Sequence, residues 1–201
     1  MAFTFFMRDQ QPLEQAADHM IPFASGRSRI KIWDAGCAQG QETYTIAMIL
    51  AAKMNQFGFK NLRIDATDYD QANNFGDSVT DAVYAAEDLQ RTPREYLDSY
   101  FEPALKPGHL RVKEHLRSRV FFQYHDLLSF KPVGFDYCLI VCKNVLLHFQ
   151  SHERVEVFRM FHGALAPGGY LLNENTQKLP PEVTPLFTQV VADARLYKKV
   201  G

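Results

Sequence analysis

The sequence predicts an α/β fold in which helices flank a mostly parallel β-sheet. Short apolar segments typical of buried strands alternate with segments of helical periodicity, as parallel strands joined by crossover helices require. Residues 135–141 form a nearly continuous apolar run, which is typical of a central strand covered on both faces. Because 201 residues suffice for one domain with a sizeable core, we expect a single domain over residues 1–201.

Six segments are expected to form the strands of this sheet. The first two run into a small-residue loop and an aspartate, and the last alternates apolar and polar residues as an antiparallel strand near an edge does. The turn at residues 167–169 leads into the fifth, and residues 109–113 have additional strand character. In chain order, the six segments are residues 29–33, 62–67, 120–124, 135–141, 170–172 and 194–200.

Three segments carry helical patterns. A long helix begins near Gln41 and presents an apolar stripe over residues 43–57, with Gly58 as its stop. A second helix covers residues 93–101. The third follows Ser151, which is a favourable N-cap residue. These helices are expected to cover the sheet.

The loop after the first strand, residues 34–40, has the pattern Asp-x-Gly-x-Ala-x-Gly. Gly36 and Gly40 permit positive φ and let the backbone approach a ligand closely. The second strand leads to Asp68, whose carboxylate is suited to accept hydrogen bonds from both hydroxyls of a ribose. A strand, a tight loop and a helix in this order bind an adenosyl ligand at the carboxyl end of a parallel sheet. The alternative is a tight strand–helix turn with no ligand.

The glycine spacing disfavours NAD as the ligand. A dinucleotide site uses Gly-x-Gly-x-x-Gly, so that the pyrophosphate sits on the helix N-terminus. Here Glu42 lies in the first helical turn, where its charge would repel a pyrophosphate. The same carboxylate suits a ligand that carries an ammonium and a sulfonium. The residues therefore favour S-adenosylmethionine over other nucleotides.

The composition excludes several classes of function. The formal net charge of −1 provides no electrostatic footprint for nucleic acid. No apolar run approaches the roughly 20 residues of a membrane span, and residues 1–7 lack the basic start of a signal peptide. The odd set of Cys37, Cys138 and Cys142 fits reduced thiols with no metal site. We expect a cytoplasmic chain with no nucleic-acid partner and no membrane insertion.

Five segments in order resemble the CheR family of chemotaxis receptor methyltransferases. The longest ends in Cys-Lys-Asn-Val-Leu-Leu-His-Phe, which is similar to the family's Cys-Arg-Asn-Val-Leu-Ile-Tyr-Phe, and the resemblance covers nearly the whole chain. It implies the Rossmann-like fold of class I SAM-dependent methyltransferases, with a small inserted β segment at 102–119. It also implies methylation of glutamate side chains of chemoreceptors, giving γ-methyl esters. The five segments are residues 4–9, 33–44, 66–70, 122–127 and 135–149.

The resemblance implies a set of contacts to the methionine end of the cofactor. Thr4 and Arg8 would contact this end, with Arg8 pairing the carboxylate in a bidentate fork. Glu42 would lie near the methionine moiety, and Lys143 and Asn144 would line the floor beside the sulfonium. In the alternative interpretation Arg8 is a surface arginine, Glu42 favours the helix dipole, and Asn144 only satisfies backbone groups.

The resemblance also implies the contacts to the nucleoside. Asp68 would hold the ribose, and Asp126 and Leu127 would flank the adenine. Asp126 has an alternative role as a turn-initiating residue. No catalytic base is expected, because a glutamate with a pKa of about 4.3 is already ionised at neutral pH. We interpret His125 and His148 as structural residues.

The chain departs from the family pattern at several positions. Ala2 replaces an asparagine, Lys143 an arginine, His148 a tyrosine and Thr43 a proline, and residues 174–177 replace Gly-His-Ser-Glu. The family's N-terminal helical domain is expected to be absent. Two alternatives to receptor methylation stay open: methylation of another protein or a small molecule, and a non-catalytic module that binds S-adenosylmethionine.

Overall fold

A seven-stranded sheet forms the centre of the computed structural model, which describes residues 4–69, 74–176 and 178–201. The strand order is β6-β2-β1-β7-β8-β10-β9, and the first five strands are mutually parallel. Strands β10 and β9 are antiparallel to their neighbours, which confirms the predicted final antiparallel strand. The strands are β1 (Ile30–Ala35), β2 (Leu62–Asp68), β6 (Val120–Tyr124), β7 (Tyr137–Cys142), β8 (Leu165–Asn173), β9 (Phe187–Gln189) and β10 (Arg195–Lys199).

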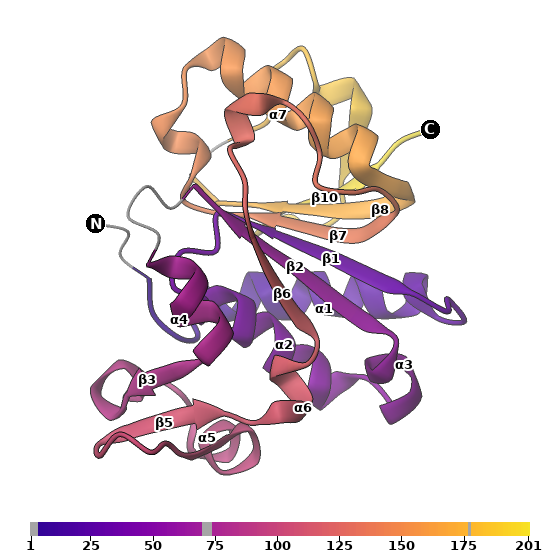
Figure 1. Cartoon of the computed structure of the whole chain (residues 1–201). Coiled ribbons are helices and arrows are strands. Elements are labelled where there is room, and N and C mark those ends of the chain that lie inside the picture. The colour runs from indigo at the N-terminus through magenta and orange to yellow at the C-terminus, as the bar shows by residue number, and fades with distance from the viewer. Residues whose placement is uncertain (1–3, 70–73, 177) are drawn as a thin grey trace.

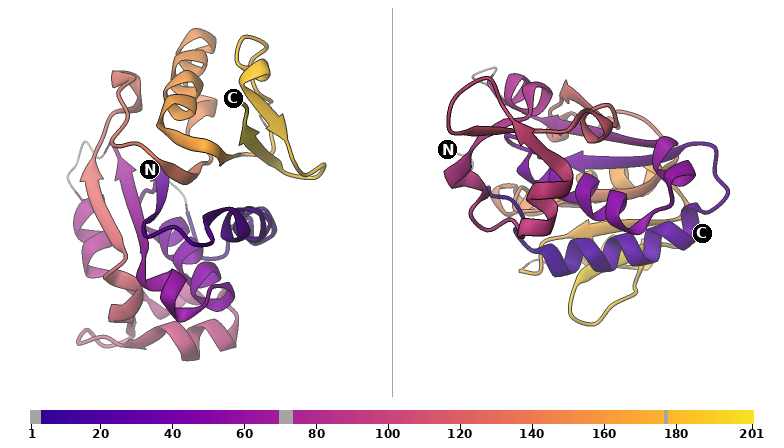
Figure 2. Two further views of the ribbon diagram at one scale, coloured as in Figure 1. Left: turned by 90° about the vertical axis from the view of Figure 1, so that its right-hand side faces the viewer. Right: turned by 90° about the horizontal axis from the view of Figure 1, so that it is seen from below.

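Helices cover both faces of this sheet (Figure 1). The helix α7 lies over one face, and α1 and α2 lie over the other, so the protein has three layers. The turned views of Figure 2 show the same layering, with α7 and α1 on opposite sides of the strands. The helices are α1 (Gln10–Ala24), α2 (Gln41–Lys53), α3 (Gln56–Lys60), α4 (Phe75–Asp81), α5 (Arg94–Tyr100), α6 (Glu114–Arg117) and α7 (Ser151–Ala164).

Each face of the sheet has its own apolar core. Alternation along β1 sends Ile32 into the core beneath α1 and α2, and Trp33 into the core beneath α7. The Trp33 indole is fully buried, and its Nε1–H donates to Thr67 Oγ1 at 2.8 Å. Because the central strands β1 and β7 are covered on both faces, a ligand reaches them at their ends.

A second sheet of three strands projects from this body, in the order β3-β5-β4 (Figure 1). Strand β5 (His109–Val112) confirms the strand character predicted at residues 109–113. It pairs antiparallel with β4 (Phe101–Pro103) and with β3 (Val83–Ala85). The third strand, β3, comes from before the segment in which the insert was predicted.

Two helix boundaries differ from those that the sequence predicts. Helix α2 ends at Lys53 and not at Phe57, and Gly58 lies inside the short helix α3 instead of stopping the long one. The Asn55 side chain accepts a hydrogen bond from Gly58 N at 2.8 Å, so an N-cap restarts the helix there. Helix α7 begins at Ser151 itself, and its N-cap is Gln150, whose N–H donates to the Glu153 carboxylate at 2.8 Å.

Other elements also differ from the prediction. Residues 167–169 do not separate α7 from a strand, because β8 begins directly at Leu165 and contains them, with a register irregularity beside β7. Strand β9 and helices α1 and α6 were not predicted. Ala2, Asp70 and Gln177, which belong to segments compared above, lie outside the described residues.

Candidate cofactor site

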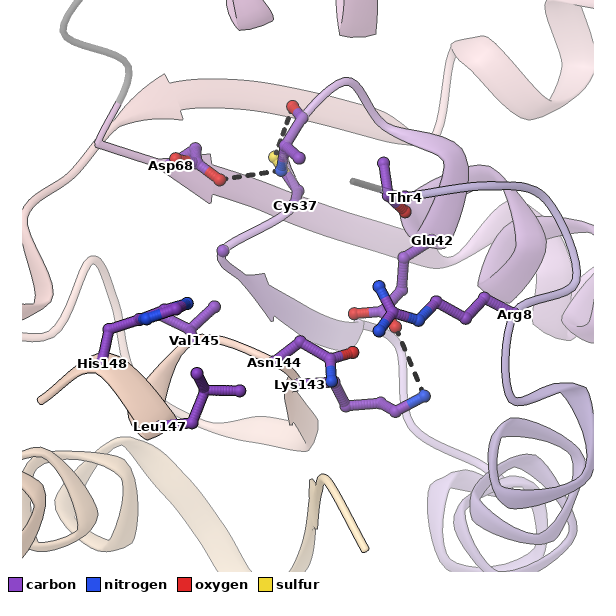
Figure 3. A pocket seen from close by; sticks show the side chains of 12 residues that line it. Thr4, Arg8, Cys37, Glu42, Asp68, Lys143, Asn144, Val145, Leu147 and His148 are labelled. Atoms are coloured by element: carbon purple, nitrogen blue, oxygen red, sulfur yellow. Dashed lines mark hydrogen bonds and ion pairs between the residues drawn. The ribbon is translucent and has the colours of Figure 1, made fainter. Parts of the chain in front are cut away.

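The carboxyl ends of β1, β2 and β7 meet at a cavity of about 380 Å³. Parallel pairing brings these three ends to one edge of the sheet, although the segments are far apart in the chain. Seven of the ten predicted site residues line this cavity, and Figure 3 labels most of them. The seven are Thr4, Arg8, Gly36, Glu42, Asp68, Lys143 and Asn144.

The loop between β1 and α2 depends on its two glycines. Gly36 has φ 96°, and a Cβ there would overlap Val145 Cγ2. Gly40 has φ 91° and precedes the first turn of α2. A Cβ on Gly40 would come within 3.0 Å of the Tyr84 hydroxyl. Gly36 lines the cavity, whereas Gly40 does not and instead sets the direction of the helix.

Asp68 ties this loop to the next strand. Its Oδ2 accepts a hydrogen bond from Ala38 N at 2.7 Å, and the N–H groups of Gly36 and Cys37 donate to Thr67 O at 2.8 and 3.0 Å. The carboxylate at the end of β2 therefore has a structural role in the loop besides its position in the cavity. Figure 3 shows it at the opposite side of the cavity from Arg8.

A second cavity of about 330 Å³ continues from the first, since both are lined by Gly36, Asp68 and Val145. Asp126 and Leu127, the two residues that the resemblance places beside the adenine, line the second cavity. Its lining also includes the apolar or aromatic side chains of Tyr69, Leu128 and Phe149. Asp126 Oδ1 accepts a hydrogen bond from Leu128 N at 2.8 Å, so this residue also initiates the turn.

Charged side chains gather at the far end of the first cavity. Lys143 Nζ lies 2.7 Å from Asp9 Oδ2 and 3.6 Å from Glu42 Oε2. Figure 3 shows Arg8, Glu42 and Lys143 pointing toward one another from three different segments. The Lys143 side chain is only 3% exposed, so its charge is held close to Glu42 by burial. This end of the cavity presents both signs of charge.

A buried carboxyl group lies behind Glu42. Asp34 is fully buried, and its Oδ2 accepts a hydrogen bond from the Thr43 hydroxyl. Burial, and then the charge of Glu42, hold the pKa of Asp34 well above its usual range. Burial also raises the pKa of Glu42, which the Lys143 charge opposes. Thr43 stands where the family has proline, so this departure supplies a donor to a buried acid.

The loop after β7 forms the floor of the cavity. Asn144 has φ 60°, and its N–H donates to Glu174 Oε2 at 3.1 Å. Glu174 is buried, and burial raises its pKa. The departure from the family at residues 174–177 therefore places a carboxyl group directly beneath the cofactor cavity.

The sequence prediction missed several lining residues. Val145, Leu147 and His148 follow Asn144 and line the first cavity. His125 lines the second cavity, where its Nε2 lies 2.7 Å from Lys131 O. Val145, Leu147 and His148 belong to segment 142–149, which resembles one continuous motif of the family. The resemblance was therefore a signal that could have identified them as lining residues.

These features fit S-adenosylmethionine. The charged end suits an ammonium and a carboxylate, the Asp68 carboxylate lies midway, and the second cavity offers apolar surface for a base. In the described residues no group of three or more potential metal ligands occurs. Within the same residues, no helix is both long and apolar enough to span a membrane.

Comparisons with known proteins identify the family of this chain. Residues 2–195 match the family described as CheR methyltransferase, SAM binding domain. Chemotaxis protein methyltransferase 1 of Pseudomonas aeruginosa is 35% identical over 179 residues, which cover 84% of this chain and 63% of that protein. Chemotaxis protein methyltransferase Cher2 of Pseudomonas putida is 34% identical over 182 residues, covering 84% and 62%.

A third relative shows that the likeness also occurs in a much longer protein. An uncharacterized 104.1 kDa protein of Rhodobacter capsulatus is 29% identical over 201 residues, which cover 97% of this chain but 20% of that protein. The chain spans less than two thirds of the length of the two Pseudomonas relatives. With its fold, its site and the match over residues 2–195, the chain belongs to the CheR methyltransferase family and corresponds to its SAM-binding domain.

Proposed function

We propose that this chain transfers the methyl group of S-adenosylmethionine to glutamate side chains in the cytoplasmic domain of a chemoreceptor. The observation that carries the proposal is the pair of joined cavities at the carboxyl ends of β1, β2 and β7. The names of the two Pseudomonas relatives support the choice of a chemotaxis protein as acceptor. The chain would therefore act in the cytoplasm.

In this proposal the charged end of the first cavity holds the methionine moiety. The Arg8 guanidinium pairs its carboxylate, because the planar fork matches both oxygens, and Thr4 adds a polar contact. Glu42 receives the ammonium. Lys143, which lies 3.6 Å from Glu42 and 2.7 Å from Asp9, keeps the Glu42 side chain in place and compensates its charge when the site is empty.

The nucleoside is proposed to lie across the junction of the two cavities. Asp68 accepts hydrogen bonds from the ribose while its Oδ2 also holds Ala38 N. Asp126 and Leu127 lie beside the adenine in the second cavity, which Val145 also lines. Gly36 lines both cavities, and it has no room for a side chain because any Cβ there would occupy the space of Val145.

The methyl transfer itself needs no general base. A glutamate acceptor is already an anion at neutral pH, since its ordinary pKa is about 4.3. The cofactor supplies an electrophilic methyl group on a sulfonium, so opposite charges disappear as the new bond forms. The chain's contribution is to orient the two groups in line and to exclude water from them. Asn144, Val145 and Leu147 line the first cavity and are placed to shield the reacting groups from water.

The acceptor can be identified by the chemical lability of its label. The protein is incubated with S-adenosylmethionine carrying a tritiated methyl group and with a chemoreceptor cytoplasmic fragment. Methyl esters hydrolyse in base, whereas methylamines do not, so the proposal expects label released as volatile methanol at alkaline pH. The Arg8→Ala variant should incorporate less label, and a fragment with its glutamates changed to alanine should incorporate none.

The same experiment distinguishes the alternatives. Base-stable label on the fragment would show that a different acceptor atom is methylated. Label in small molecules or in another protein would redirect the assignment to that substrate. Tight cofactor binding with no labelled product would support a module that binds S-adenosylmethionine without turnover.

A further inference from the structure

A basic groove lies at the opposite end of the sheet from the cofactor site. It has a volume of about 610 Å³ and is formed where β1, β2 and β6 begin, because Arg29, Asn61 and Arg119 directly precede these strands. Parallel strands put their amino ends at one edge and their carboxyl ends at the other. The groove therefore shares no lining residue with either cofactor cavity.

The groove collects positive charge in a chain whose formal net charge is −1. None of the described residues lining it is acidic, and its other polar lining residues are Ser28, Asn61 and Ser118. Its five cationic residues are Arg29, Lys31, Lys60, Arg63 and Arg119. Like charges held together in this way repel one another, and an anionic partner relieves that repulsion.

Most of this charge has no acidic partner. Among the described residues, an ion pair is found for Arg63 alone of the five, with Asp65 at 2.7 Å. Asp65 is itself buried, and its second oxygen accepts a hydrogen bond from the Tyr137 hydroxyl at 2.8 Å. Within the described residues, the charges of the other four cations are therefore not neutralised by a carboxylate.

Two of the cations are fixed in place by the backbone. Lys31 Nζ donates to Phe135 O at 2.8 Å, and Arg119 Nη1 donates to Lys60 O at 2.6 Å. The side chains of Arg29 and Lys60 extend from exposed residues beside them. A partly preorganised set of donors loses less conformational entropy when an anion binds.

The form of the groove favours carboxylates over nucleic acid. A single-stranded nucleic acid needs an open aromatic face on which to stack its bases. Phe121 is the aromatic residue of the lining, and the Arg63 guanidinium lies 4.0 Å from its ring centre. The chain as a whole also lacks the excess of positive charge that phosphate backbones require. Carboxylates pair with arginine and lysine side chains at short range and need no stacking surface.

We propose that this groove is a docking site for a carboxylate-rich segment of a protein partner. Such a segment would lie across the amino ends of β1, β2 and β6 and would leave the cofactor cavities open. The proposal goes beyond methyl transfer and does not depend on the identity of the methyl acceptor.

Binding of a fluorescein-labelled octaglutamate peptide, followed by fluorescence anisotropy at low ionic strength, tests this site. Octaglutamine serves as the neutral probe, and a labelled single-stranded RNA of similar length serves as the competing polyanion. The groove variant is Arg29→Glu/Lys60→Glu. Its matched control is Lys106→Glu/Lys198→Glu, which makes the same change in net charge at exposed positions outside the groove. Thermal unfolding and titration with S-adenosylmethionine check that each variant is folded.

The proposal expects saturable binding of octaglutamate and weak binding of octaglutamine. The groove variant should lose at least about tenfold in affinity, and the control variant less than about twofold, because only near charges act at short range. Affinity for S-adenosylmethionine should be unchanged in both. If the glutamate variant fails to fold, Arg29→Gln/Lys60→Gln removes the same cations without adding acids and should show the same direction.

Several results would overturn the docking site. These are no saturable binding of octaglutamate, equal losses in the groove and control variants, or equal affinity for octaglutamine. Tighter binding of RNA than of the peptide by the unmodified protein would reassign the groove to nucleic acid. Failure of S-adenosylmethionine to bind the unmodified protein would instead count against the proposed function, since the peptide measurement needs no cofactor.

Discussion

The Thr43 hydroxyl donates a hydrogen bond to Oδ2 of Asp34, and both side chains are shielded from water. Among the described residues no donor reaches Oδ1 of Asp34, and burial, followed by the charge of Glu42, raises the Asp34 pKa. Two facing carboxyl groups are stable in a buried site when a proton lies between them. The pair therefore favours a protonated Asp34 behind the Glu42 carboxylate at the charged end of the cavity.

This arrangement predicts a pH-dependent difference between the protein and its Asp34→Asn variant. In the unfolded chain the Asp34 pKa is about 3.9, and in the folded protein burial and Glu42 raise it. Between these two values the folded state binds more protons, so the stability contribution of Asp34 falls as pH rises above about 4. Asparagine does not titrate. Thermal unfolding from pH 4 to pH 8 should show the variant gaining stability relative to the unmodified protein as pH increases.

The surface change Glu87→Gln is the control for this series, since Glu87 is exposed and lies outside both cofactor cavities. Its difference from the unmodified protein should not follow the same trend. Parallel stability curves for the protein and Asp34→Asn would mean that Asp34 does not hold a proton in the folded state.

Asp68 is predicted to contribute to cofactor affinity through two separable contacts. Asp68→Ala removes both the ribose acceptor and the hydrogen bond to Ala38 N, and should weaken S-adenosylmethionine by about 1–3 kcal/mol. Asp68→Asn keeps an oxygen for Ala38 N but removes the charge, so its loss reports the ribose contact. Isothermal titration measures both. No heat with S-adenosylmethionine or its demethylated product, together with saturable binding of NAD, would refute the assigned ligand.

Arg8 is predicted to recognise the methionine carboxylate. Arg8→Ala should weaken S-adenosylmethionine by roughly tenfold or more while leaving adenosine affinity almost unchanged, because adenosine lacks that carboxylate. Arg8→Lys keeps the charge without the planar fork and should give an intermediate affinity. Equal losses for the two ligands in competition titrations would point to a structural effect on the segment before α1.

Gly36 is predicted to be intolerant of any side chain. Gly36→Ala would place a methyl group against Val145 Cγ2 and force alanine to φ 96°, a conformation that costs roughly 1–3 kcal/mol. The double change Gly36→Ala/Val145→Ala relieves the overlap but not the backbone strain. Urea unfolding should therefore find the double variant less stable than Val145→Ala alone and more stable than Gly36→Ala. A double variant no better than the single one would show that the steric contact is unimportant.

Local patterns explain why much of the fold was predictable. The apolar run before Cys142 and the strand that leads to Asp68 form strands because each has the composition of a segment buried on both faces. The end of α2 at Lys53 and the N-cap of α7 at Gln150 were harder to predict. Each depends on a side-chain hydrogen bond: Asn55 caps the next helix, α3, and the Glu153 carboxylate accepts from Gln150 N. Helix α1 was missed, although its sequence carries a helical signal. Its buried residues recur at the spacing of one helix face: Leu13, Ala16, Ala17, Met20 and Ala24.

For this protein the sequence by itself determined the parallel α/β order, the glycine loop and the carboxylate at the end of β2, because these depend on local composition and spacing. Only the tertiary structure decided what these residues touch. Strand pairing places Asp68 against Ala38, and folding of the first helix brings Asp9 to Lys143. The burial of Asp34, and the gathering of cations before β1, β2 and β6, likewise arise from contacts between distant segments, which no local pattern encodes.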